Sequence, residues 1–257
     1  MEIWQSLVLG IVQGITEWLP ISSSGHLVLF QELFGLTVPL SFDILLHFST
    51  LLVLFVFYYK DLIKIVMAWL KWDVKSVDFK LGLFLIIGTI PIGLIGVLFG
   101  DFISSLFGSL LYVGIALIFT GVVLFLTRKI KHGSKKVSLK SGILVGLVQM
   151  FAILPGVSRS GMTISSSLIL GISREEAARF SFMLAIPAIL GATILEGGKI
   201  IGSGLGFWPV AVGMISSFVV GYLSLKWLLG VISRDGFWKF GYYVIALGGV
   251  LVVVSLI

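Results

Sequence analysis

The sequence predicts an all-α polytopic membrane protein, with six transmembrane helices and two re-entrant helical hairpins arranged as an inverted-topology repeat. Three observations lead to this fold class. Hydrophobic residues make up 58% of the 257 residues and charged residues only 12%, about half the charged share of an average soluble domain. Long apolar stretches alternate with short basic turns, and two polar motifs recur in the two halves of the chain. Such a chain has too little polar surface for water and requires a bilayer as its solvent.

Six stretches are apolar and long enough to cross the hydrocarbon core, which takes about 17–25 helical residues. Their interiors are nearly free of charged residues. This supports the existence of each span, whereas the exact first and last residues are less well defined. The predicted spans are residues 41–59, 81–100, 109–127, 176–196, 207–227 and 237–257.

Two further apolar regions, 3–34 and 142–171, are interrupted by polar residues, and each contains a proline, Pro20 or Pro155, before a Ser-rich turn. Each part is too short to cross a bilayer alone, and each break exposes backbone N–H and C=O groups. Within the hydrocarbon, such a break is stable only where it is packed in protein or lines a wet cavity. We therefore predict two re-entrant hairpins that reach mid-depth and return to their own side.

Lys and Arg cluster in alternate turns and predict the orientation of the chain. The turns 60–80, 128–140 and 226–239 carry fourteen basic residues, whereas the other turns between spans carry only Lys199. Strict alternation of the spans places the basic turns in the cytoplasm and both termini outside. The chain is then expected to be a multi-pass protein of the bacterial inner membrane, and its basic residues indicate topology rather than a nucleic-acid partner.

The two broken regions match each other in sequence. Residues 10–13 recur as 146–149 and residues 22–25 as 158–161, both at an offset of 136 positions. Residues 43–49 resemble 175–181.

This match divides one membrane domain, residues 1–257, into a first repeat of about 1–127, a basic cytoplasmic linker 128–140, and a second repeat of about 141–257. Each repeat has one hairpin and three spans, an odd number, so the second repeat has the opposite orientation. The hairpin turns then meet near the midplane, where inverted-repeat folds place their binding sites.

Polar residues of the two turns form the candidate site. Gln13 and Glu17 are four positions apart and share one helix face. After each proline, a Ser-rich turn starts a helix whose free N–H groups suit an anion, and Arg159 adds a fork of donors suited to phosphate oxygens. The candidate phosphate-binding residues are Ser22, Ser24, Gly25, Ser158, Ser160 and Gly161.

Structural roles are the alternative for several of these residues. Ser and Gly in membrane helices often serve close packing, although two matching Ser-Gly turns are hard to explain in that way. A buried charge costs at least about 2.5–3.5 kcal/mol, so Glu17 and Arg159 are expected to pair with each other or to bind substrate and metal. His26 has no partner evident in the sequence and can equally pack. His47 and Arg179, near span ends, are candidates only for supporting the site.

Residues 13–26 (QGITEWLPISSSGH) and 155–161 (PGVSRSG) resemble the two signature motifs of the undecaprenyl-diphosphate phosphatase (bacitracin-resistance protein) family. The resemblance covers essentially the whole chain. At the first acidic position of the first motif this chain has Gln13, a variant that the family pattern allows, which leaves Glu17 as the only carboxylate of that pair.

The resemblance implies removal of the terminal phosphate from a C55 polyprenyl diphosphate, which yields the monophosphate carrier of peptidoglycan synthesis. It implies bacitracin resistance as well, because that antibiotic sequesters the substrate. A divalent metal, Mg²⁺ or Ca²⁺, a site open to the extracytoplasmic side and a homodimer are further implications, although nothing in the sequence itself indicates dimerisation.

The requirements of phosphoryl transfer, which are positioning and charge neutralisation, assign roles as a hypothesis. Glu17 with Gln13 would hold the metal, since hard oxygen ligands suit Mg²⁺ or Ca²⁺, and Arg159 would stabilise the transferred phosphoryl group. Ser23 is the preferred nucleophile. His26 activates Ser23, protonates the leaving group or is itself phosphorylated, and the sequence leaves these three options open. A serine nucleophile needs a nearby base, and Glu17 is the other candidate base that is close in sequence.

Two other interpretations compete with this one. Inverted repeats with broken helices are also how secondary transporters are built, so a transporter or flippase of polyprenyl phosphate lipids is the alternative function. The buried charged motifs disfavour a purely structural scaffold. Residues 24–26 also resemble a motif of the acid-phosphatase superfamily, but no His follows Ser158-Arg159 at a workable distance.

Overall fold

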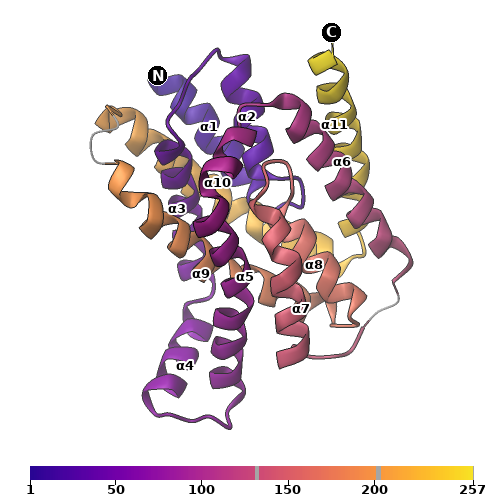
Figure 1. Cartoon of the computed structure of the whole chain (residues 1–257). Coiled ribbons are helices and arrows are strands. Elements are labelled where there is room, and N and C mark those ends of the chain that lie inside the picture. Colours follow the sequence, from indigo (N-terminus) through magenta and orange to yellow (C-terminus); the bar gives the residue numbers. More distant parts are fainter. Residues whose placement is uncertain (131–132, 201–203, 257) are drawn as a thin grey trace.

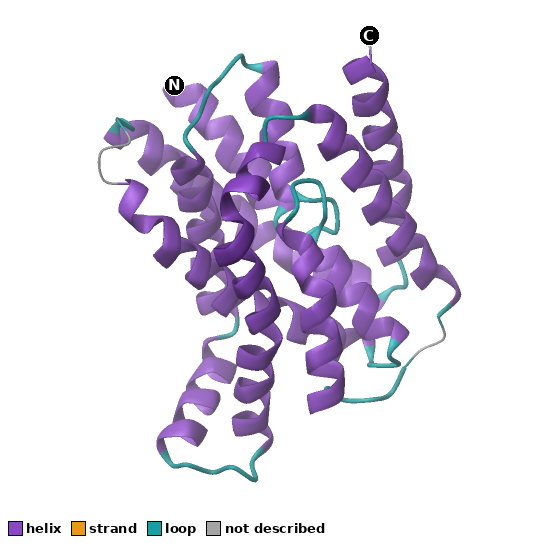
Figure 2. Ribbon diagram, in the orientation of Figure 1, coloured by secondary structure: helices purple, strands orange, loops and turns teal. Residues whose placement is uncertain are grey.

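The computed structural model describes residues 1–130, 133–200 and 204–256, and within these residues it consists of helices and connecting loops without a strand (Figure 2). The all-α class is therefore confirmed. Residues 131–132 of the predicted basic linker and residue 257 of the predicted sixth span lie outside the described residues.

Among the described residues, six helices are long and apolar enough to cross a membrane, as predicted. They are α3 (Leu40–Phe57), α5 (Val77–Leu106), α6 (Leu110–Leu126), α9 (Arg174–Ile200), α10 (Phe207–Ser233) and α11 (Phe240–Leu256). The 3-10 turns η1 (Thr127–Lys129) and η3 (Phe237–Lys239) follow α6 and precede α11. The chain is a multi-pass membrane protein, and the predicted ends were less accurate than the spans themselves. For example, α5 begins before residue 81 because Ser76 caps the N–H group of Phe79 at 3.1 Å.

One helix was missed by the sequence analysis, α4 (Tyr59–Leu70), which lies in the region assigned to a basic turn. Its side chains Ile65 and Trp69 pack closely over Gly82 of α5, and the Trp69 and Phe79 rings stack with centroids 5.2 Å apart. This segment was assigned to a basic turn because of its lysines, but it forms an amphipathic helix whose apolar face covers α5. In Figure 1, α4 and the start of α5 form the end of the molecule opposite to both chain termini.

Both broken regions fold as two short helices joined by a turn. The first comprises α1 (Ile3–Thr16) and α2 (Ser23–Leu33), and the second comprises α7 (Leu139–Gln149), η2 (Met150–Ile153) and α8 (Arg159–Ile169). The second helix of each pair starts with the same N-cap. Ser22 Oγ accepts the N–H group of Gly25 at 3.3 Å, and Ser158 Oγ accepts that of Gly161 at 3.1 Å.

The main helix pairs join the first half of the chain to the second: α1 packs on α10, α7 on α5, α3 on α9 and α6 on α11. Small residues permit close approach at these contacts. Within the described residues, the two halves therefore interdigitate instead of forming separate lobes.

The two turns also meet inside the bundle. Ser160 Oγ of the second turn donates to the carbonyl oxygen of Leu19 in the first turn at 3.0 Å. The loop between η2 and α8 lies in the middle of the bundle in Figure 2. This contact brings the polar residues of both broken regions to one place.

The α6–α11 contact yields a test of the packing. A Cβ atom at Gly248 would lie 2.6 Å from the carbonyl oxygen of Gly114, whereas one at the adjacent Gly249 meets nothing within 4 Å. We expect Gly248→Ala to lower the free energy of unfolding by about 1–3 kcal/mol, because the helices must separate. Gly249→Ala is the matched control and should be neutral or slightly stabilising. Thermal unfolding in detergent measures both, and equal stabilities of the two variants would contradict the described α6–α11 contact.

Candidate active site

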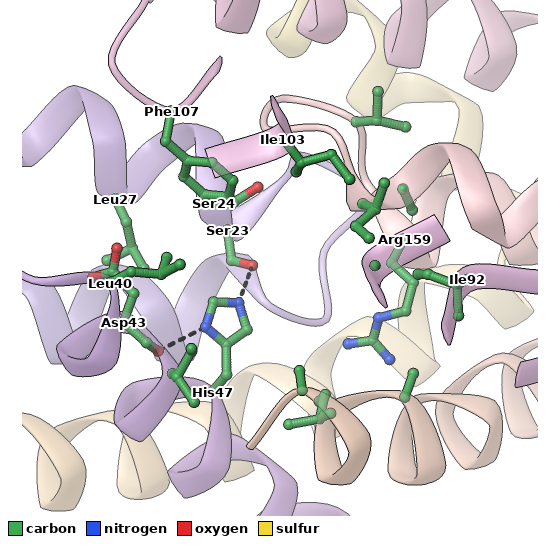
Figure 3. Close-up of a pocket in the computed structure, with 18 of the residues that line it drawn as sticks. Ser23, Ser24, Leu27, Leu40, Asp43, His47, Ile92, Ile103, Phe107 and Arg159 are labelled. Atoms are coloured by element: carbon green, nitrogen blue, oxygen red, sulfur yellow. Dashed lines mark hydrogen bonds between the residues drawn. The ribbon is translucent and has the colours of Figure 1, made fainter. Parts of the chain in front are cut away.

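A cavity of about 290 Å³ lies where the two turns face α3, α5 and α9 (Figure 3). One part of its lining is polar, and the rest consists of apolar and small residues of α2, α3, α5, η2, α9 and the second turn. The polar lining residues are Glu17, Ser22, Ser23, Ser24, Asp43, His47, Ser158 and Arg159, together with Ser104 and Thr193 farther along the walls. The cavity is therefore amphiphilic.

Glu17 is the centre of the polar region. Its backbone N–H group bonds to the carbonyl oxygen of Gln13 at 2.9 Å, so it continues α1 by one residue, and its side chain is only 3% exposed. Arg159 Nη2 donates to Glu17 Oε1 in an ion pair. Ser23 Oγ donates to Glu17 Oε2 at 2.6 Å, and Gln13 Nε2 does so at 3.0 Å. The structure thus brings together Glu17, Ser23 and Arg159 from two hairpins.

The second turn, which carries Arg159, is held in place by two hydrogen bonds to α6. Arg159 is the first residue of α8, directly after its N-cap Ser158. The backbone N–H group of Ser158 donates to Thr120 Oγ1 at 3.1 Å, and Thr120 Oγ1 donates to the carbonyl oxygen of Gly156 at 3.0 Å. These bonds fix the turn to α6, so the guanidinium group extends into the cavity from a rigid base (Figure 3).

The other candidate phosphate-binding residues divide into two groups. Ser22, Ser24 and Ser158 line the cavity, whereas Gly25, Ser160 and Gly161 do not. The last three lie at the contact between the turns: Gly25 is close to Gly156, and Gly161 is close to Pro20. Their small size permits the turns to approach each other.

His26 is not brought to Ser23. Its Nδ1 atom bonds to the carbonyl oxygen of Ser22 at 2.7 Å, its Nε2 atom bonds to the hydroxyl group of Tyr243 at 2.8 Å, and its ring stacks on that of Tyr243. His26 is buried and is not among the residues that line the cavity. Its contacts support the backbone of Ser22, which has a φ of 68°, in the left-handed region that is uncommon for serine.

His47 of α3 is instead the imidazole next to Ser23. Its Nε2 atom lies 3.4 Å from Ser23 Oγ and 3.3 Å from Glu17 Oε2. Asp43, one helical turn earlier, is buried and accepts a hydrogen bond from Gln31 at 2.7 Å. The sequence repeat includes residues 43–49, but His47 was expected only to support the site, and Asp43 was not singled out as a site residue.

Arg179, the counterpart of His47 in the repeat, lies elsewhere. Its Nη2 atom is 2.7 Å from Asp61 of α4, and its Nη1 atom is 3.6 Å from Glu176. Arg179 is not among the cavity-lining residues. Its role is to hold α4 against α9.

Gln13 and Glu17 do not form a ready-made metal cage. Both oxygens of Glu17 already accept hydrogen bonds, and Gln13 directs its Nε2 atom at Glu17. The Gln13 Oε1 atom, which has no hydrogen-bond partner among the described residues, therefore faces away from the carboxylate. The described part of the chain also contains no cluster of three or more His, Asp or Glu that could hold a metal. A metal at this site needs most of its ligands from substrate and water.

Comparison with known proteins gives consistent matches. A family model described as bacitracin resistance protein BacA matches residues 6–250. A protein named undecaprenyl-diphosphatase from Methanobrevibacter smithii is 41% identical over 261 residues, which cover 95% of this chain and 94% of the relative. Relatives of the same name are found in Carboxydothermus hydrogenoformans, 42% identical and covering 99% of this chain and 98% of the relative, and in Methanosphaera stadtmanae, 39% identical and covering 100% and 99%.

The buried ion pair yields a stability prediction. Glu17→Gln should lower the free energy of unfolding by about 3–5 kcal/mol, because it leaves the Arg159 charge without a partner at a buried site. Glu17→Gln combined with Arg159→Met should be less destabilised than the sum of the single variants. Asp61→Asn, at the half-buried pair with Arg179, is the control and should cost about 0–1 kcal/mol.

Chemical or thermal unfolding in detergent measures all four variants. Strict additivity of the Glu17 and Arg159 substitutions would show that the two side chains do not interact in the folded protein.

Proposed function

The chain belongs to the bacitracin resistance protein BacA family, and from this premise we propose that it hydrolyses undecaprenyl diphosphate to undecaprenyl phosphate and inorganic phosphate. The protein is thus a membrane-bound phosphatase that recycles the lipid carrier of peptidoglycan synthesis. Its activity confers bacitracin resistance, because it removes the diphosphate lipid that the antibiotic sequesters.

The observation that carries this function is the placement of Ser23 and Arg159 on the two oxygens of one buried carboxylate, at the polar part of a cavity with apolar walls. Within the polar part, Arg159 supplies a positive charge for the diphosphate group of the substrate. The apolar lining accommodates the first isoprene units, and it includes Ile92 and Ile103 of α5 and Ala188 of α9. A soluble phosphorylated substrate would have no use for these walls.

The roles of the residues follow from the geometry. Ser23 attacks the terminal phosphorus, and the undecaprenyl phosphate leaves with the bridging oxygen; water then hydrolyses the phosphoserine. Arg159 uses the guanidinium N–H groups that do not face Glu17 to bind the oxygens of the transferred phosphoryl group. The N–H groups of the first turn of α2, which starts at Ser23, add a positive dipole end. Glu17 orients both Ser23 and Arg159.

We also propose that this site binds a divalent cation, Mg²⁺ or Ca²⁺, which would neutralise part of the charge of the diphosphate. Phosphate oxygens and water would supply most of its ligands, since Mg²⁺ sites typically combine one or two carboxylates with substrate phosphates and water. Glu17 and Asp43 are the carboxylates that line the cavity. Homodimerisation, which the family resemblance implies, stays a prediction.

Phosphate release from purified protein and undecaprenyl diphosphate in detergent tests the function. We expect Arg159→Ala to lower kcat by about 10²–10³ and Ser23→Ala to lower it further, because it removes the nucleophile. Ser166→Ala is the matched control, since Ser166 bonds within α8 and does not line the cavity. A chelator should abolish activity, and added Mg²⁺ or Ca²⁺ should restore it. Lipid binding without phosphate release by the wild type, in the presence of metal, would indicate a transporter.

For the topology, we propose that α1–α2 and α7–α8 are re-entrant hairpins of an inverted repeat, in a cell membrane with both termini outside and the basic linker 128–140 in the cytoplasm. Three features support this arrangement. The hairpin of each half packs on a span of the other half, the basic turns alternate with nearly uncharged ones, and both chain ends lie opposite to α4 (Figure 1).

Because the chain has no cysteine, single cysteines report the topology without background. We expect Glu2→Cys and Ser105→Cys to react with a membrane-impermeant maleimide in intact spheroplasts. Lys75→Cys and Lys136→Cys should react only after permeabilisation. All four positions are exposed, so burial does not explain a lack of labelling. The opposite pattern would invert the proposed orientation.

A further inference from the structure

His47 faces the reacting hydroxyl group from the helix opposite to the two turns. Its side chain is 25% exposed and lines the cavity between Asp43 and Ser23 (Figure 3). Its Nε2 atom lies 3.4 Å from Ser23 Oγ and 3.3 Å from Glu17 Oε2, close to hydrogen-bond distance from both atoms. Distances of this kind typically shorten when substrate closes a site.

The other ring nitrogen determines which tautomer His47 adopts. Its Nδ1 atom is 2.8 Å from the backbone carbonyl oxygen of Asp43. A carbonyl oxygen only accepts, so Nδ1 carries a hydrogen, and in the neutral ring the lone pair is on Nε2. The lone pair therefore faces Ser23 Oγ. The hydroxyl hydrogen of Ser23, which is donated to Glu17 Oε2 in this structure, reaches Nε2 when the hydroxyl group rotates.

Glu17 is placed to stabilise a cation at His47 rather than to take a proton itself. Its Oε1 atom accepts from Arg159, and its Oε2 atom accepts from Gln13 and Ser23. Protonation of this carboxylate would leave the Arg159 charge unpaired at a buried site, which is costly. A protonated His47 would instead donate Nε2–H to Glu17, as a carboxylate stabilises the imidazolium of a serine-hydrolase triad.

His26, the histidine nearest to Ser23 in sequence, has both ring nitrogens occupied. Since Nδ1 donates to the carbonyl oxygen of Ser22, Nε2 is the acceptor of the Tyr243 hydroxyl group. Neither atom is free to approach Ser23 unless α2 separates from α11. His26 is therefore a positioning residue that holds the Ser22 turn.

We propose that His47 is the proton acceptor for Ser23, an inference that rests on the proposed phosphatase function. As the bond from Ser23 Oγ to the terminal phosphorus forms, the hydroxyl proton moves to His47 Nε2. The bond from phosphorus to the bridging oxygen breaks, and its electron pair leaves with undecaprenyl phosphate, to which His47 returns the proton. In the second step, His47 accepts a proton from the attacking water. The phosphorus–Oγ bond then breaks, phosphate leaves, and Ser23 recovers its hydrogen from His47.

Chemical rescue tests this assignment. His47→Ala should lower kcat by about 10²–10⁴, the usual contribution of a general base, with KM changed only a few-fold. Added imidazole should restore a large part of the lost kcat, because it fits into the space left in an open cavity. His26→Ala is the matched comparison: it should lower the unfolding temperature, and imidazole should not restore its activity. Ser23→Ala should be inactive with or without imidazole.

A variant of similar size keeps the test decisive if His47→Ala folds poorly. His47→Gln preserves a polar side chain of similar length but cannot take up the proton, so its kcat should fall by a similar factor. A kcat near that of the wild type for His47→Gln, or imidazole rescue of His26→Ala but not of His47→Ala, would overturn the role of His47. In both cases an active wild type and an inactive Ser23→Ala would leave the phosphatase function standing. A wild type that releases no phosphate would overturn both.

Discussion

The buried ion pair between Glu17 and Arg159 is the constraint on which the architecture depends. Each charge alone would cost several kcal/mol at a buried site, so neither turn is stable without the opposite charge of the other turn. Each tip requires the other. This requirement explains why the hairpin of one half packs on a span of the other half, and why small residues such as Gly25 and Gly156 lie where the turns touch. The site exists only as a contact between the two halves.

The sequence predicts some parts of this architecture well and others poorly. Hydropathy locates the six spans, and the proline-serine breaks locate both hairpins. The repeat together with the charge pattern predicts that Glu17 and Arg159 meet. The ends of the spans are predicted less well. The helix α4 was not predicted, because the lysines on one of its faces suggest a polar turn, although its other face is apolar and covers α5.

The choice between the two histidines lies beyond sequence reasoning for a specific physical reason. Nearness along the chain favours His26, but its ring bonds back to the carbonyl oxygen of Ser22, one helical turn earlier, and so turns toward α11. His47 reaches the site only because α3 packs against the first hairpin and α9. Tertiary packing determines which face of a helix lines the cavity, and no local sequence pattern encodes this.

The repeat also explains why a chain with two similar turns has one active centre. The offset of 136 positions pairs Ser23 with Arg159, and these are the first residues of α2 and α8. It likewise pairs Glu17 with Ile153. The scaffold is thus shared, whereas the chemistry is divided: one turn carries the anion and the nucleophile, and the other carries the cation. Two identical acidic or basic turns would repel each other at the contact, so divergence at these positions is what permits the turns to meet.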